Sequence, residues 1–242
     1  MEPAKKNWKK EMLRGLLWGI LLSPISFLII SYWFDVFHCK HRLWHKLENI
    51  GGIEVYTANA DEIDLMHTMF MVLPKPFVNA TKTISIVQDD DCYALEHSKI
   101  KAGGHTIDRD ICIRRRCFYS GVVVHELTHS YADLHSPQLP KEWDALAGDV
   151  YKDKVSYPDP DKDPNAFPQN GILSDYGATN SSEDLAVWVE ECYMYLIHGD
   201  LNSPLPLVNR SNPIYGRKLH FLLEWGILNE TDYQTLRPLV EE

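Results

Sequence analysis

A long apolar segment near the N-terminus is the clearest pattern in the chain. Residues 15–34 carry no charge, and twenty helical residues at about 1.5 Å each span the roughly 30 Å hydrocarbon core of a bilayer. Basic residues outnumber acidic ones by five to two in the first fourteen positions, so the positive-inside rule places residues 1–14 in the cytoplasm. We therefore predict a transmembrane signal anchor over residues 15–35. The alternatives are a cleaved secretory signal and a buried core helix.

Shorter patterns after this segment predict a folded domain over residues 50–242, joined to the anchor by a juxtamembrane linker over residues 36–49. Runs of β-branched residues with some alternation indicate strands. The predicted strands cover residues 53–56, 83–87 and 105–113. A turn at Gly103-Gly104 precedes the third of them. If residues 15–35 are not cleaved, this is a type II membrane protein whose domain faces a lumen or the exterior. If they are cleaved, the domain is secreted.

Helices dominate the second half of the chain. Apolar spacing, Pro residues and cap-like residues predict them. The predicted helices cover residues 117–134, 143–151, 181–197 and 213–226, with a shorter one from Thr231. Pro137 and Pro140 are expected to end the first of these helices. Strands followed by helices predict an α+β fold.

Charge narrows the range of partners. The chain has 24 basic and 34 acidic residues, of which five and two lie before residue 15, so the remainder carries 19 against 32 and a net charge of −13. An acidic domain lacks the electrostatic surface that binds nucleic acid, and we exclude that class of partner.

The five cysteines include no CxxC pair, so a cysteine-based zinc site is not expected. In an oxidising lumen, we expect Cys92 to form a disulfide with either Cys112 or Cys117. N-x-S/T sequons are compatible with export as a glycoprotein. They begin at Asn79, Asn180, Asn209 and Asn229.

The strongest chemical motif is His125-Glu126-Leu127-Thr128-His129. Positions i and i+4 lie on one face of a helix, so His125 and His129 can present two imidazole nitrogens to one zinc ion. Glu126 is placed to take a proton from the attacking water and pass it to the leaving amine. A chain of this composition would contain roughly 0.03 such motifs by chance. The motif is typical of zincin metallopeptidases.

A catalytic zinc site needs a third protein ligand. His135 follows His125 by ten residues, which is the metzincin spacing, but Ala132 stands where that family has a turning glycine. In a straight helix residue 135 lies about 80° off the face of residue 125 and roughly 15 Å along the axis. His135 therefore reaches the metal only if the helix breaks.

Glu183 is the other candidate. The stretch from Asp175 to Ala186 reads DYGATNSSEDLA, which resembles the Y-x-x-T-N-x-x-E-x-x-A signature of compact gluzincins related to the anthrax lethal factor protease domain. The resemblance implies that Glu183 is the third zinc ligand and that Tyr176 stabilises the developing oxyanion. It also implies a zincin-like fold, in which the edge strand before the active helix pairs with an extended substrate.

The chain departs from that family at Val187, where an acidic residue is common. Support for a ligating histidine would then come from Asp133 or Asp184. A glycan at Asn180 would crowd this metal site, so we predict that its sequon is unused.

The sequence therefore predicts a membrane-anchored zinc endopeptidase that binds one Zn²⁺ per chain and cleaves peptide or protein substrates. Two alternatives remain open, namely a catalytically inactive zincin-like binding or scaffolding domain and a metzincin-type peptidase that uses His135.

Overall fold

The computed structural model describes residues 46–87, 103–147, 170–199 and 203–242. The predicted cytoplasmic tail, the anchor over residues 15–35 and most of the linker lie outside these ranges. Within them, no helix combines the length and apolar character needed to cross a bilayer.

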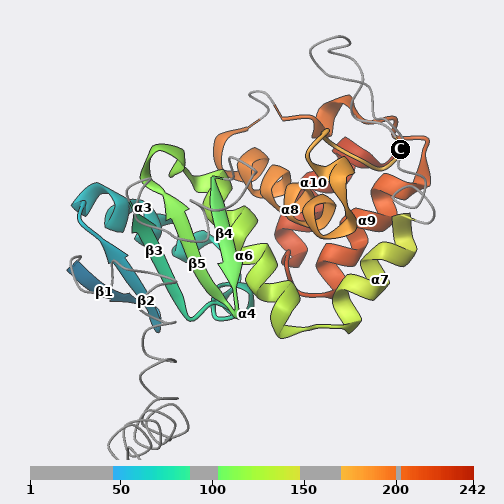
Figure 1. Ribbon diagram of the computed structural model, residues 1–242. Coiled ribbons are helices and arrows are strands. Elements are labelled where there is room, and N and C mark those ends of the chain that lie inside the picture. Colours follow the sequence, from blue (N-terminus) through green and yellow to red (C-terminus); the bar gives the residue numbers. More distant parts are fainter. Residues whose placement is uncertain (1–45, 88–102, 148–169, 200–202) are drawn as a thin grey trace, which may run out of the picture.

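A mixed five-stranded sheet forms one side of the described domain (Figure 1). Its strands are β1 (Lys46–Ile50), β2 (Ile53–Thr57), β3 (Thr83–Val87), β4 (Gly104–Ile107) and β5 (Asp110–Arg114). The spatial order is β1-β2-β3-β5-β4, with β2, β3 and β5 parallel and the outer strands antiparallel to their neighbours. The α+β class and the strands at residues 53–56 and 83–87 are confirmed.

Strand β1 corrects the predicted domain boundary. Four of its residues were assigned to the linker, yet all five pair with β2. The connection is a two-residue turn in which Gly51 and Gly52 have φ angles of 63° and 97°. Only glycine adopts such angles without a steric penalty. The Gly-Gly pair was thus a hairpin signal that the sequence analysis missed.

The single strand predicted over residues 105–113 is wrong, because the chain reverses direction inside it. Asp108 and Arg109 have φ angles of 50° and 72° and connect β4 to β5 as a tight hairpin. Asp-Arg lacks the glycine that usually marks such a turn. Tertiary contacts support it instead: the Arg109 guanidinium donates to the carbonyl oxygens of Asn79 and Ala80.

Three helices lie next to the sheet, namely α3 (Ala60–Val72), α4 (Lys75–Val78) and α6 (Ser120–Leu134). Contacts join α3 to β1 and β2, and α6 to β4 and β5. Residues from these helices and from the strands form one continuous core, including Met66, Met69, Phe77, Ile84, Ile86, Ile111 and Leu127. Helices α3 and α4 were not predicted. Helix α6 starts three residues later than predicted, after a 3₁₀ turn at Arg115–Cys117.

The remaining helices lie on the far side of α6 (Figure 1). They are α7 (Gln138–Ala147), α8 (Ser181–His198), α9 (Pro213–Glu224) and α10 (Glu230–Val240). Pro140, predicted to end a helix, lies in the first turn of α7, where its missing N–H costs nothing. Pro213 opens α9 and Gly226 follows its end, as predicted. Helix α6 packs against α8, and this pairing builds the site described next.

Candidate metal centre

Helix α6 presents both histidines of the motif on one face. Their Nε2 atoms lie 3.3 Å apart. The opposite face of the helix is held in the core by Val123, Val124 and Leu127, which are fully buried. The positions of the two imidazoles are therefore set by a helix that cannot rotate without exposing apolar surface.

Helix α8 brings Glu183 to these rings. Asn180 caps the helix, since its side-chain oxygen accepts hydrogen bonds of 3.0 Å from the N–H groups of Ser182 and Glu183. The Oε2 atom of Glu183 lies 3.0 Å from Nε2 of His125 and 3.4 Å from Nε2 of His129. Ligand atoms of the three residues all lie within 4.8 Å of one another, so this group could hold a metal ion.

The pKa values of this cluster follow from its contacts. Burial alone lowers the pKa of His125, but hydrogen bonds to Glu183 and Glu190 outweigh it and raise the pKa to about 9. Burial raises the pKa of Glu183, but hydrogen bonds to His125 and His129 outweigh it and hold that pKa well below its usual value. Glu183 is therefore anionic at neutral pH and could serve as a charged ligand, and a bound cation would displace the proton from His125.

The outer nitrogen of each ring also has a partner. Nδ1 of His125 lies 3.1 Å from Oε2 of Glu190, and Nδ1 of His129 lies 3.3 Å from Oγ of Ser182. The carboxylate on Nδ1 of His125 accepts a hydrogen bond from the Nδ1 proton and so leaves Nε2 directed inward, as metal-binding imidazoles require.

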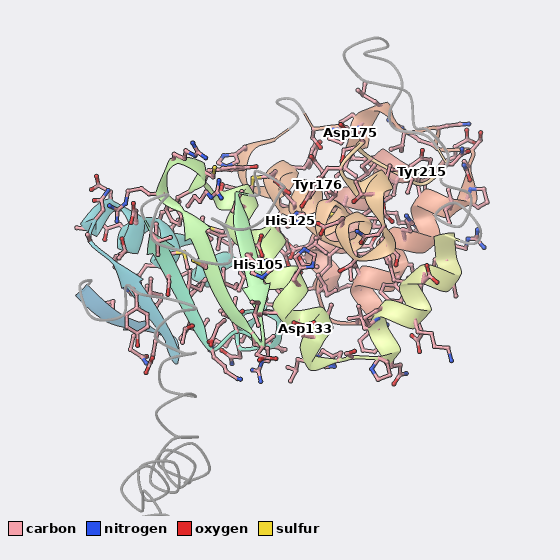
Figure 2. The ribbon with its side chains drawn as sticks, viewed as in Figure 1. His105, His125, Asp133, Asp175, Tyr176 and Tyr215 are labelled. Atoms are coloured by element: carbon pink, nitrogen blue, oxygen red, sulfur yellow. The ribbon has the colours of Figure 1, made fainter. Side chains whose placement is uncertain are left out.

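Glu190 was missed by the sequence analysis, which expected Asp133 or Asp184 in this role. Asp133 is exposed near the end of α6 (Figure 2), and Asp184 is buried beside Lys218 and Trp143. Glu190 follows Glu183 by seven residues, which is two helical turns, so both side chains lie on one face of α8. That spacing was the available signal.

Glu126 points toward the sheet. The Thr106 hydroxyl on β4 donates a hydrogen bond of 2.6 Å to its Oε2 atom. A Cβ atom at Gly104 would lie 2.6 Å from Oε1 of Glu126, so glycine at this position leaves room for the carboxylate. Thr106 and Gly104 were not predicted to contribute to the site.

Tyr176 lies beside His125 (Figure 2), with ring centroids 5.6 Å apart. The residue remains 43% exposed. Partial burial of the hydroxyl, and then the charge of Glu183, raise its pKa above the usual value. The phenol is therefore a hydrogen-bond donor at neutral pH, next to the cluster and open to solvent.

The structure keeps His135 away from the cluster. It caps the C-terminus of α6, and its ring packs against Tyr131 and Trp225 at centroid distances of 4.4 and 5.5 Å. The helix does not turn at Ala132, which is what its helix propensity predicts.

Two further predictions, the disulfide of Cys92 and the unused sequon at Asn180, stay predictions. Cys117 is a free thiol, whereas Cys92 lies outside the described residues. The Asn180 side chain is engaged as the α8 cap, and its sequon remains predicted to be unused.

Comparison of the chain with models of protein families, with curated proteins and with solved structures found no match. The chemistry of the site therefore carries the functional assignment.

Proposed function

We propose that this protein is a zinc-dependent endopeptidase of the gluzincin type with a zincin-like fold, anchored by residues 15–35 with its active site in a lumen or outside the cell. The observation that supports this proposal is the convergence of ligand atoms of His125, His129 and Glu183 within 4.8 Å, with the charge of Glu126 close enough to act on His125. A histidine pair with one carboxylate is a common donor set for catalytic zinc, and it leaves a fourth position open.

The donor set also suits zinc electrostatically. The two rings are oriented by Glu190 and Ser182, and Glu183 supplies one negative charge. When bound, zinc supplies Lewis-acid polarisation of the scissile carbonyl and of the attacking water.

Glu126 would act as the general base and then as the general acid. Its carboxylate accepts a proton as the water oxygen bonds to the carbonyl carbon. It then delivers that proton to the amine nitrogen as the C–N bond breaks. The Thr106 hydroxyl holds Oε2 of Glu126 in place. The Tyr176 phenol would donate a hydrogen bond to the carbonyl oxygen as that atom becomes negative.

Strand β4 would align the substrate. It ends the sheet next to β5 and is in contact with α6. An extended peptide that adds to this edge by backbone pairing would run beside Glu126, which itself contacts Gly104 and Thr106 of β4.

The test compares three variants of the full-length protein. Glu126→Gln should retain zinc and lose at least about 100-fold of the peptidase activity, because the base is removed and the ligands stay. Glu183→Ala should lose bound zinc. His135→Ala is the matched control and should keep both zinc and activity. Zinc is measured in the purified protein, and cleavage with a diverse peptide library.

Loss of zinc in His135→Ala with retention in Glu183→Ala would replace the gluzincin assignment by a metzincin one. A wild-type protein that binds zinc and cleaves no peptide would instead indicate a zincin-like binding domain.

A further inference from the structure

Tyr119 connects the start of α6 to the support of the metal site. It is the residue before α6, and its hydroxyl donates a hydrogen bond of 3.1 Å to Oε1 of Glu190 on α8. The other carboxylate oxygen of Glu190 lies 3.1 Å from Nδ1 of His125. Each oxygen of this carboxylate is thus used, and a continuous chain runs from Tyr119 through Glu190 to the imidazole.

Gly121 makes this arrangement possible. A Cβ atom at position 121 would collide with the Tyr119 ring and with Oε1 of Glu190. The first turn of α6 therefore leaves space for the ring and the carboxylate together. Glycine is less favourable than alanine in a helix by about 1 kcal/mol, and this is the free-energy cost of leaving that space.

Tyr119 differs from the buried tyrosines Tyr131 and Tyr193. Its side chain remains 50% exposed, whereas Tyr131 and Tyr193 are almost fully buried. The hydroxyls of those two residues donate to the backbone oxygens of Trp225 and Ile227. Tyr119 donates instead to a carboxylate that contacts His125. Partial burial of the hydroxyl, and then the charge of Glu190, raise the pKa of Tyr119, so its hydroxyl remains a donor at neutral pH.

We propose that Tyr119 is a positioning residue of the metal centre, which holds Glu190 in the orientation that fixes His125 and so sets the affinity for the metal. A carboxylate on the outer nitrogen of a ligating histidine fixes the ring and increases its basicity. A carboxylate free to rotate about its side-chain bonds does this for only part of the time. The phenol removes that freedom. This inference rests on the proposed zinc site but not on peptidase activity.

The experiment measures the zinc affinity of the full-length protein by competition with a chromophoric chelator. Loss of a partner of this kind typically weakens metal binding by about 10–100-fold, and we expect that range for Glu190→Ala. Tyr119→Phe removes only the hydroxyl and should weaken binding by about 3–10-fold, since Glu190 remains. Tyr131→Phe removes a hydroxyl that contacts neither Glu190 nor the imidazoles of the site, so it is the matched control and should bind zinc like the wild type.

A double variant distinguishes the chain from a general structural effect. If Tyr119 acts through Glu190, then Tyr119→Phe should change affinity no further in the Glu190→Ala background. Thermal unfolding without metal checks that each variant is folded. The absorption spectrum of the Co²⁺ form should shift in Tyr119→Phe and stay unchanged in Tyr131→Phe.

Wild-type affinity in Tyr119→Phe would overturn this inference and leave the zinc site intact. An equal effect of Tyr119→Phe with and without Glu190 would also overturn it. A wild-type protein that binds no zinc would instead reject the metal site itself, and with it the proposed function.

Discussion

Two polar clusters meet at the first turn of α8, on different faces of the helix. Glu183 faces the imidazoles of α6, where its side chain is 22% exposed and that of His129 is 19% exposed. Asp184, the next residue, faces α7 and α9 and forms an ion pair with Lys218 in which both side chains have zero exposure. The first cluster is open to a ligand, whereas protein groups enclose the second.

The enclosed cluster has its own dense set of partners. Trp143 donates a hydrogen bond of 3.1 Å from its indole to Asp184, and Lys218 donates one of 3.0 Å to the carbonyl oxygen of Gly171. The ammonium group also lies 4.8 Å from the centre of the Trp143 ring. Burial lowers the pKa of Lys218, and the charge of Asp184 opposes that shift.

The difference shows how one helical turn can serve both stability and chemistry. The buried pair joins α8 to α9 and to the segment around Gly171, which precedes Tyr176 along the chain. It therefore holds these segments together, while Glu183 on a different face of α8 remains available to a cation. Breaking a buried pair leaves an uncompensated charge in a low dielectric, and a partly exposed group does not carry that cost.

The largest effect on stability should come from Lys218→Met. Removing the cation leaves Asp184 buried and unneutralised, and we expect the free energy of unfolding to fall by about 3–5 kcal/mol. Denaturant unfolding of the metal-free protein measures this. Glu183→Ala should cost clearly less in the same assay, because its site is partly open to water.

Two controls sharpen this contrast. Lys141→Met makes the same change at an exposed position of α7 and should stay within about 0.5 kcal/mol of the wild type. Asp184→Asn with Lys218→Met removes both charges and should recover most of the loss. Equal destabilisation by Glu183→Ala and Lys218→Met would show that the two clusters do not differ in kind.

A smaller effect, confined to the open cluster, is expected for Tyr176→Phe. Loss of one donor to a developing oxyanion commonly costs about 100-fold or more, and the half-exposed position of Tyr176 suggests about 10–100-fold in kcat. KM, zinc content and unfolding should hardly change, since the ring remains. A rise in KM at constant kcat would instead assign Tyr176 to substrate binding.

The smallest effect concerns Glu191, which belongs to neither cluster. Burial, and then the charge of Glu190, raise the pKa of Glu191 from 4.5 to about 7. Because the folded pKa is the higher one, its contribution to stability is fully present below pH 4.5 and is lost as the pH rises through 7. Glu191→Gln mimics the protonated form, so it should be more stable than the wild type at pH 8 by about 1 kcal/mol after allowance for solvent screening.

The comparison at about pH 3.5, below the unfolded pKa, is the internal control for Glu191, where wild type and variant should unfold alike. A stability difference that does not depend on pH would refute this interpretation of the Glu191 environment.

Local features of the sequence predicted much of the fold. Helix α8 was predicted within one residue at each end, and Pro213 and Gly226 bounded α9, because caps and breakers act within a single turn. The β4–β5 hairpin was missed because the positive φ of Arg109 is supported by hydrogen bonds that its guanidinium donates to Asn79 and Ala80, which are distant in sequence. Helix α3 was also missed; it packs on β1 and β2 and starts at an Asn59 cap that the sequence analysis overlooked.

In the site, too, local sequence predicted some residues, whereas tertiary contacts determined the others. The spacing of His125 and His129 places them on one face of any helix, so the sequence alone determined that pair. Glu190 lies on the same face of α8 as Glu183, but its contact with His125 exists only because α8 runs antiparallel to α6. The partners Thr106 and Gly104 depend in turn on the hairpin that the sequence did not reveal.

Glu183 and Asp184 show most clearly where prediction from the sequence ends. Successive residues on a helix point about 100° apart, so the sequence alone determined that these two acids face different directions. Tertiary structure decided that one direction holds two imidazoles and the other holds Lys218 and Trp143. The reason is that helix periodicity is local, whereas the environment of each face depends on how distant segments pack around it.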